Sequence, residues 1–213
     1  YVYARTGPEK KQLSTFILEK SKSHFAAGKP IHKIGMRASP TGELIFNDTI
    51  IPVAQRVGEE NQSIIHLMKN LEIERITIAG ISLGIAKACL EQSVRYANER
   101  KQFGTTIGHF QMIQKMIAEM AAETEMMEHY LYSIAKSFDQ GLCDKSSAAK
   151  VKLNIPKMVT KIALDAIQIH GGYGYSREFP LERYLRDNKL MEIGAGTNEV
   201  MIIIIAKSLL ELK

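Results

Sequence analysis

The run Ile64-Ile-His-Leu-Met-Lys-Asn-Leu71 decides the fold, because its apolar residues recur at steps of three and four. The same spacing continues through Ile85 toward Tyr96. Apolar residues at these steps line one face of an α-helix. The pattern therefore predicts one long helix that begins near Glu59 and ends near Arg100.

Helical patterns fill the rest of the chain. They run from about His109 to Phe138, Ser146 to Ile169, Pro180 to Leu190 and Asn198 to Leu212. The second helix carries an apolar stripe, which we interpret as core packing and which comprises Met112, Met116, Met120, Met127 and Leu131. Long helices joined by short loops favour an antiparallel up-down bundle. Pro156 falls inside the third helix, where it has no amide to donate, so we expect a kink there.

Residues 1–56 have strand character instead. Apolar or alternating runs at Tyr1–Ala4, Thr15–Glu19 and Glu43–Phe46 predict short strands of a small sheet. The first residue already lies in a strand pattern, so we expect the sheet to be part of a larger β domain and the chain to be a fragment or a processed product. The predicted fold class is α+β, mainly α: a partial antiparallel β domain over 1–56, then a C-terminal four-helix bundle over 57–213.

Composition excludes several classes of function. The formal charge is +5, but the 28 Lys and Arg are interleaved with 23 Asp and Glu, so no basic stripe predicts a nucleic-acid partner. No apolar run approaches the ~20 residues of a membrane-spanning helix. The six histidines show no metal-ligand spacing. The two cysteines, Cys89 and Cys143, are isolated and are expected to be free thiols.

Three motifs lie at predicted helix ends: Arg100-Lys-Gln-Phe-Gly104, Gln168-Ile-His-Gly-Gly-Tyr-Gly-Tyr175 and Glu192-Ile-Gly-Ala-Gly-Thr-Asn-Glu199. Each one alone is explained as a helix cap or a helix stop. Each also suits a ligand, because arginine pairs with phosphate, glycine lets the backbone approach closely, and a helix N-terminus presents free amides to an anion. Together, in this order, they resemble the C-terminal half of the acyl-CoA dehydrogenases, flavoenzymes that oxidise the Cα–Cβ bond of an acyl thioester.

The resemblance extends into the β segment through Ile34-Gly-Met-Arg-Ala-Ser-Pro-Thr-Gly-Glu-Leu-Ile-Phe-Asn-Asp48. It implies the acyl-CoA dehydrogenase fold without its N-terminal helical domain and the first half of its β domain. It also implies FAD as the cofactor. The residues that match the family's cofactor contacts are Arg100, Gln111, Gln168, Ile169, His170, Gly171, Gly172, Thr197, Asn198 and Glu199.

The catalytic base is implied by the same resemblance. Most of the family carries a catalytic glutamate where this chain has Ala195, and the Gly194-Ala-Gly196 variant is similar to the isovaleryl-CoA dehydrogenase branch, in which the position matched by Glu74 supplies the base. A glutamate on a helix is by itself usually a solvated surface residue. Substrate contacts are implied for Arg75, Gly194, Ala195 and Gly196, and the small residues favour a short branched acyl group.

The implied partners are an acyl-CoA substrate, an electron-transfer flavoprotein as electron acceptor, and further copies of the chain in a dimer of dimers that shares FAD between subunits. The implied location is the mitochondrial matrix or a bacterial cytoplasm. Two alternatives stay open. One is a non-enzymatic helical-bundle subunit derived from the family, and the other is a straight-chain acyl-CoA dehydrogenase or an acyl-CoA oxidase.

Overall fold

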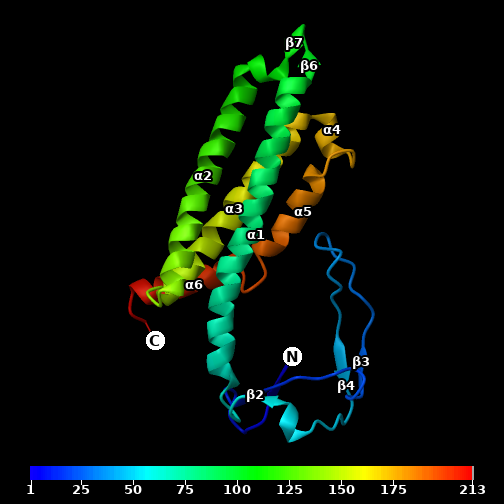
Figure 1. The fold of residues 1–213 in the computed structure, drawn as a ribbon, viewed down its shortest axis with the longest axis vertical. Coiled ribbons are helices and arrows are strands. Elements are labelled where there is room, and N and C mark those ends of the chain that lie inside the picture. The colour runs from blue at the N-terminus through cyan, green and yellow to red at the C-terminus, as the bar shows by residue number, and fades with distance from the viewer. Residues whose placement is uncertain (213) are drawn as a thin grey trace. The chain divides into compact units, whose positions relative to one another are not determined.

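The structure is a computed structural model that describes residues 1–212 (Figure 1). The chain separates into two compact units, each described by itself. The first comprises residues 1–33 and 37–71, and the second comprises Ile34–Met36 and the chain from Glu72 onward. The predicted domain boundary between residues 56 and 57 stays a prediction.

The first unit contains short antiparallel strands. A three-stranded sheet has the order β1-β2-β5, with Val2 opposite Phe16 and Arg5 opposite Leu13, and β3 pairs with β4 in a second sheet. The elements are β1 (Val2–Arg5), β2 (Leu13–Phe16), β3 (Phe25–Ala27), β4 (Leu44–Phe46), the 3₁₀ turn η1 (Val53–Gln55) and β5 (Arg56–Val57). The strands predicted at 1–4 and 43–46 are confirmed. The one predicted at 15–19 instead begins at Leu13 and ends at Phe16.

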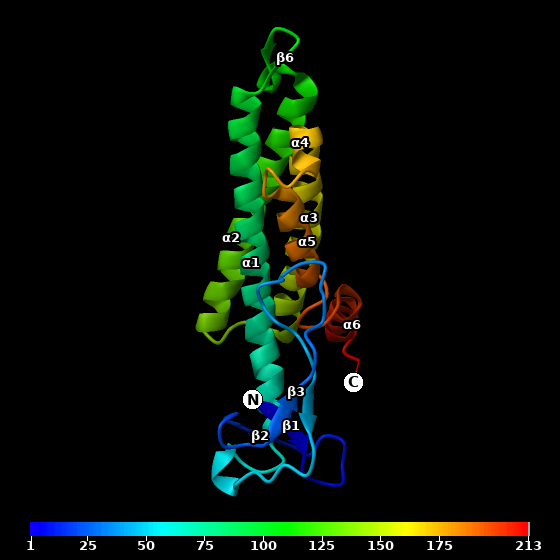
Figure 2. The same cartoon turned by 90° about the vertical axis from the view of Figure 1, so that its right-hand side faces the viewer.

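The second unit is helical. Its elements are α1 (Ser63–Glu99, which begins in the first unit), β6 (Lys101–Gln102), β7 (Thr105–Thr106), the 3₁₀ turn η2 (Ile107–His109), α2 (Gln111–Asp139), α3 (Lys145–His170), α4 (Gly172–Tyr175), α5 (Leu181–Met191) and α6 (Asn198–Leu209). Figure 2 shows α1, α2, α3 and α5 running alternately up and down. The predicted α+β class with an up-down bundle is confirmed.

The core of the bundle lies between α1, α2, α3 and α5. Small α1 residues such as Ala79 and Ala86 let the helices approach, and Met120 and Met127 of α2 fill the space between them, all at most 1% exposed. The core interpretation of the methionine stripe is wrong for Met112, which is 80% exposed at the second position of α2.

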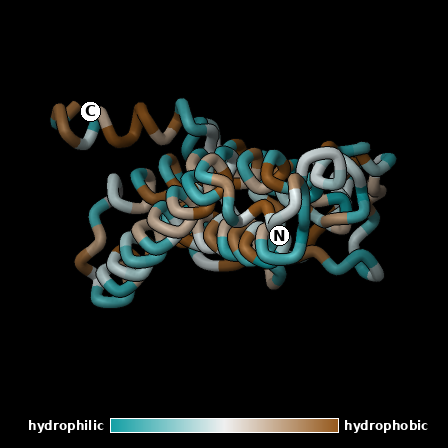
Figure 3. Tube along the Cα trace, turned by 90° about the horizontal axis from the view of Figure 1, so that it is seen from above, coloured by the Kyte–Doolittle hydropathy of each residue, from teal (hydrophilic) through white to brown (hydrophobic). Residues whose placement is uncertain are grey.

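Helix α3 is the central element of this unit, since it packs against α2, α4, α5 and α6. It runs continuously through the buried Pro156, and the predicted kink stays a prediction. Helix α6 buries Met201 but leaves Ile202 and Ile203 more than half exposed, and Figure 3 shows this apolar run near the C-terminus. No helix within residues 1–212 is both long enough and apolar enough to cross a membrane.

Candidate cofactor and substrate sites

A tight hairpin places Arg100 at the far end of α1. Strands β6 and β7 are joined by Phe103 and Gly104, whose φ angles of 53° and 82° are typical of a two-residue turn with left-handed central residues. The Ile107 amide donates to the Arg100 carbonyl at 2.8 Å, which closes the hairpin. The guanidinium carbon of Arg100 lies 5.7 Å from the centre of the Tyr173 ring.

The two glycines at the end of α3 turn the chain directly into α4. Gly171 has φ 57° and ψ −133°, a conformation that residues with a side chain rarely adopt. A Cβ on Gly171 or Gly172 would meet nothing within 4 Å, so their backbone is open to a ligand. Gly174 is the opposite case, because a Cβ there would lie 2.3 Å from the Ile167 carbonyl oxygen.

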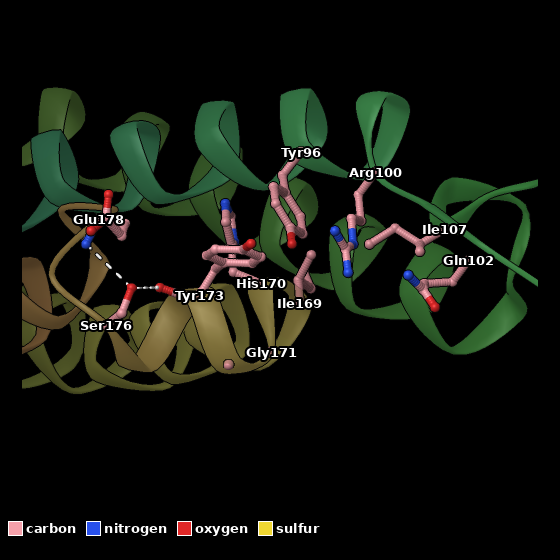
Figure 4. A pocket seen from close by; sticks show the side chains of 11 residues that line it. Tyr96, Arg100, Gln102, Ile107, Ile169, His170, Gly171, Tyr173, Ser176 and Glu178 are labelled. Carbon is pink, nitrogen blue, oxygen red and sulfur yellow. Dashed lines mark hydrogen bonds between the residues drawn. The ribbon is translucent and has the colours of Figure 1, made fainter.

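These elements enclose a pocket of about 590 Å³ (Figure 4). Its walls come from the end of α1, the hairpin and the α3–α4 junction. The lining residues are Tyr96, Arg100, Gln102, Ile107, Ile169, His170, Gly171, Gly172, Tyr173, Ser176 and Glu178. The pocket therefore combines one guanidinium and one carboxylate with two tyrosine rings and an open glycine backbone. The rings and the guanidinium suit a nucleotide, whose base can stack and whose phosphate can pair with arginine.

His170 forms the buried wall of this pocket. It is 2% exposed, and its ring stacks on Tyr96 with 4.2 Å between the ring centres. Nδ1 lies 2.8 Å from the Ala166 carbonyl, which can only accept, so Nδ1 carries the proton. Burial lowers the pKa of His170, although this hydrogen bond opposes the shift. Nε2 is therefore a lone-pair acceptor, and it is buried without a partner among residues 1–212.

A second candidate site lies at the loop between α5 and α6. The buried Lys152 ammonium donates to the carbonyls of Glu192, at 2.9 Å, and Gly196. The Arg75 Nε donates to the Ala195 carbonyl at 3.4 Å. The amides of Ala195 and Gly196 donate no hydrogen bond within residues 1–212. Two cations thus hold the loop by its carbonyls while two of its amides stay available.

The backbone of this loop is unusual. Ala195 has φ 52° and Gly196 has φ 98°. A Cβ on Gly196 would lie 2.9 Å from the Met201 methyl, and one on Gly194 would lie 3.4 Å from the Leu190 carbonyl oxygen. The positive φ of Gly196 favours glycine there, whereas a Cβ on Gly194 would make only an ordinary van der Waals contact.

The N-terminus of α6 continues the second site. Thr197 caps the helix by accepting from the Val200 amide at 3.4 Å. Asn198 donates to the Glu192 carboxylate at 3.3 Å, and its own Oδ1 is buried without a partner among residues 1–212. A hydrogen bond from its own amide and one from Thr197 lower the pKa of the exposed Glu199 carboxyl. The hydrogen-bonding capacity of Asn198 Oδ1 is therefore left unused by residues 1–212.

The structure brings together only some of the residues singled out from the sequence. The pocket unites Arg100 with Ile169, His170, Gly171 and Gly172, whereas Gln111 and Gln168 are exposed and do not line it. The loop unites Arg75, Gly194, Ala195 and Gly196 with Thr197, Asn198 and Glu199. Glu74 is exposed and adjacent in sequence to Arg75, which is 8% exposed and faces the loop.

Sequence reasoning missed several pocket and loop residues. Tyr96 precedes Arg100 by one helical turn, and that spacing is a usable signal. Tyr173 lies inside the glycine motif itself. Lys152 carried no signal, because a lysine within a helix is normally solvated.

The two candidate sites lie at opposite ends of α3. Lys152 and His170 are 18 residues apart, which is roughly 27 Å along a helix axis. No group of three His, Cys, Asp or Glu side chains suited to a metal occurs in the described part of the chain. The sites therefore consist of amides, cations and rings rather than metal ligands.

Comparisons with known protein families, sequences and structures all point to one family. The model of the acyl-CoA dehydrogenase C-terminal domain matches residues 64–210. The mitochondrial isovaleryl-CoA dehydrogenase of Pongo abelii is 41% identical over 211 residues, which is 97% of this chain and 50% of that protein. The chain thus spans about half the length of the curated relatives it matches.

Solved structures agree with this match. Butyryl-CoA dehydrogenase from Megasphaera elsdenii has a TM-score of 0.93 and 35% identity, covering 98% of this chain and 55% of that one. A chain of the structure described as "Electron transferring flavoprotein of Acidaminococcus fermentans" has a TM-score of 0.89 and 39% identity, covering 93% of this chain and 52% of that one.

Proposed function

Because this chain belongs to the acyl-CoA dehydrogenase family, we propose that it is part of an FAD-dependent enzyme that converts a short branched acyl-CoA into its 2-enoyl-CoA. The observation that carries the proposal is the loop at 192–196, whose free amides at Ala195 and Gly196 suit a developing thioester oxyanion. The small side chains at positions 194–196 favour a branched acyl group.

FAD fits the residues that the chain offers. The pocket holds an unpartnered buried acceptor, His170 Nε2, beside the Arg100 guanidinium and two glycines with no atom in front of them. We propose that it takes the nucleotide part of the cofactor. Asn198 Oδ1, the second unpartnered acceptor, would accept from the cofactor at the other site together with Thr197 and Glu199. When bound, FAD supplies the acceptor for the hydride that leaves the substrate Cβ.

Sharing of the cofactor between two copies follows from the separation of the sites. The pocket and the loop lie roughly 27 Å apart along α3, so the pocket of one copy is poorly placed to hold the cofactor that serves its own loop. We propose a homo-oligomer in which each copy's pocket binds the cofactor of its partner. An electron-transfer flavoprotein is the proposed electron acceptor, and one solved relative comes from a structure described by that name.

The chain's own residues perform the proton transfer in this proposal. Glu74 takes the α proton of the substrate, while the thioester carbonyl oxygen accepts hydrogen bonds from the loop amides. Glu74 is exposed in this chain, on the turn of α1 that brings Arg75 to the loop. Arg75 orients the loop by holding the Ala195 carbonyl.

The test uses the complete protein, its visible spectrum and two matched variants. Addition of isovaleryl-CoA to the parent should bleach the flavin, faster than butyryl-CoA does. Replacement of Glu74 with Gln should slow this bleaching by about 10²–10⁴-fold, whereas Glu72→Gln, two residues away on the same helix, should leave it unchanged. A colourless protein would support the scaffold alternative, and an unimpaired Glu74→Gln variant would remove Glu74 as the base.

A further inference from the structure

Lys152 is a lysine with no access to solvent. Its exposed fraction is 0%, whereas Lys157, five residues further along the same helix, is exposed. A buried ammonium is costly unless its donors are satisfied. The Lys152 donors go to the backbone carbonyls of Glu192 and Gly196, four residues apart in the same loop. The ammonium therefore ties the two ends of one loop together.

This arrangement decides where the loop amides face. In a trans peptide unit the carbonyl and the following amide point to opposite sides. Because Arg75 holds the Ala195 carbonyl, the Gly196 amide faces away from Arg75, and because Lys152 holds the Gly196 carbonyl, the Thr197 amide faces away from Lys152. Arg75 thus fixes the peptide unit that carries the free Gly196 amide. Lys152 fixes the next peptide unit and, through the Glu192 carbonyl, the start of the loop, so the Ala195 amide lies between peptide units that are held on both sides.

We infer that Lys152 is a positioning residue: through the carbonyls of Glu192 and Gly196 it holds the Gly194-Ala195-Gly196 loop so that its free amides can bind the thioester oxyanion. This inference rests on the proposed function. Lys152 touches neither substrate nor cofactor in this scheme and acts only through the loop.

Lys152 loses its charge at a pH close to neutral rather than in strong alkali. Burial lowers its pKa to about 8, with Arg75 of α1 acting in the same direction, while Glu192 of the loop and Glu199 of α6 oppose the shift. Charge-assisted hydrogen bonds are stronger than neutral ones. The loop is therefore held most firmly below pH 8, and the hold weakens as Lys152 loses its proton.

The experiment compares Lys152→Met, Lys152→Arg and the control Lys157→Met in the complete flavin-containing protein. The expected result for Lys152→Met is flavin reduction by isovaleryl-CoA that is about 10- to 100-fold slower, with a smaller change in KM. Parent flavin reduction should also decline above pH 8, and Lys152→Arg should retain activity without that decline. Lys157→Met should match the parent in both rate and pH profile.

The outcomes separate this inference from the proposed function. If the parent binds no flavin or reduces none, the proposed function fails. If the parent is active and Lys152→Met matches it in kcat and in pH profile, the positioning role is overturned while the function stands. If Lys152→Met does not fold, the pH profiles of the parent and of Lys152→Arg test the positioning role instead. A decline in the rate of flavin reduction above pH 8 that persists in Lys152→Arg overturns the inference.

Discussion

Replacement of Asp144 with Ala should destabilise the helix that carries both candidate sites. Asp144 is the N-cap of α3, and its Oδ1 accepts from the Ser146 amide at 2.6 Å, the Ser147 amide at 2.8 Å and the Ser146 hydroxyl at 2.7 Å. Loss of an N-cap side chain costs about 0.5–2 kcal/mol. For a chain of this size each kcal/mol lowers Tm by roughly 2–4 °C.

The pH dependence of this effect has a defined sign. The Ser146 hydroxyl and the Ser146 and Ser147 amides lower the pKa of Asp144 below its ordinary value, although partial burial opposes them. A carboxyl with a lowered pKa in the folded state stabilises the fold above its unfolded pKa of about 4, and the effect disappears as the pH falls through the folded value. The difference in the free energy of unfolding between the parent and Asp144→Ala should therefore become smaller in strong acid.

The assay is urea unfolding followed by circular dichroism at neutral and strongly acidic pH. Asp144→Asn keeps an acceptor and loses only the charge, so it should lie between the parent and Asp144→Ala. Asp139→Ala, at the last residue of α2, removes a nearby carboxylate that caps nothing and serves as the control. Equal stability of the parent and Asp144→Ala at neutral pH would refute the cap argument.

Two further predictions concern the bundle. Gly174→Ala should cost about 1–3 kcal/mol and weaken flavin binding, because its Cβ would lie 2.3 Å from the Ile167 carbonyl oxygen. Gly84→Ala, in α1 with no atom within 4 Å of its Cβ, should stabilise the fold instead, and thermal unfolding of both checks the pair. Thiol labelling should modify the half-buried Cys143 in the folded protein. Cys89, buried and with its pKa raised to about 12, should react only after unfolding, so rapid labelling of Cys89 contradicts its burial.

The helices could be predicted because their signals are local. The three- and four-residue spacing around Ile85 and the polar residues before α3 and α6 lie within a few positions of the structure they specify. Strands β3 and β5 were not predicted, since a strand of two or three residues depends on a partner elsewhere in the chain. The burial of Met112 was predicted wrongly because periodicity identifies the apolar face of a helix but not how far along the helix neighbouring elements cover that face.

The residues of the candidate sites also differ in how well the sequence predicts them. Arg100 and the 169–172 segment could be singled out because they lie in compact motifs. Lys152 could not, because the loop that buries it lies 40 residues further along the chain. The segment Ile34–Met36 belongs to the helical unit because Arg186 donates to the Ile34 carbonyl at 2.7 Å and the Met36 amide donates to Asp187 at 2.6 Å.

The loop at 192–196 is hard to explain by stability alone. Ala195 at φ 52° lies in the left-handed region, which costs an L-residue about 1–2 kcal/mol. The two side chains that hold it, Lys152 and Arg75, are buried cations, each of which folding must desolvate. An apolar contact and a relaxed turn would connect α5 to α6 with neither cost. A strained residue held by two buried charges, with free amides beside it, is therefore best explained by what those amides bind.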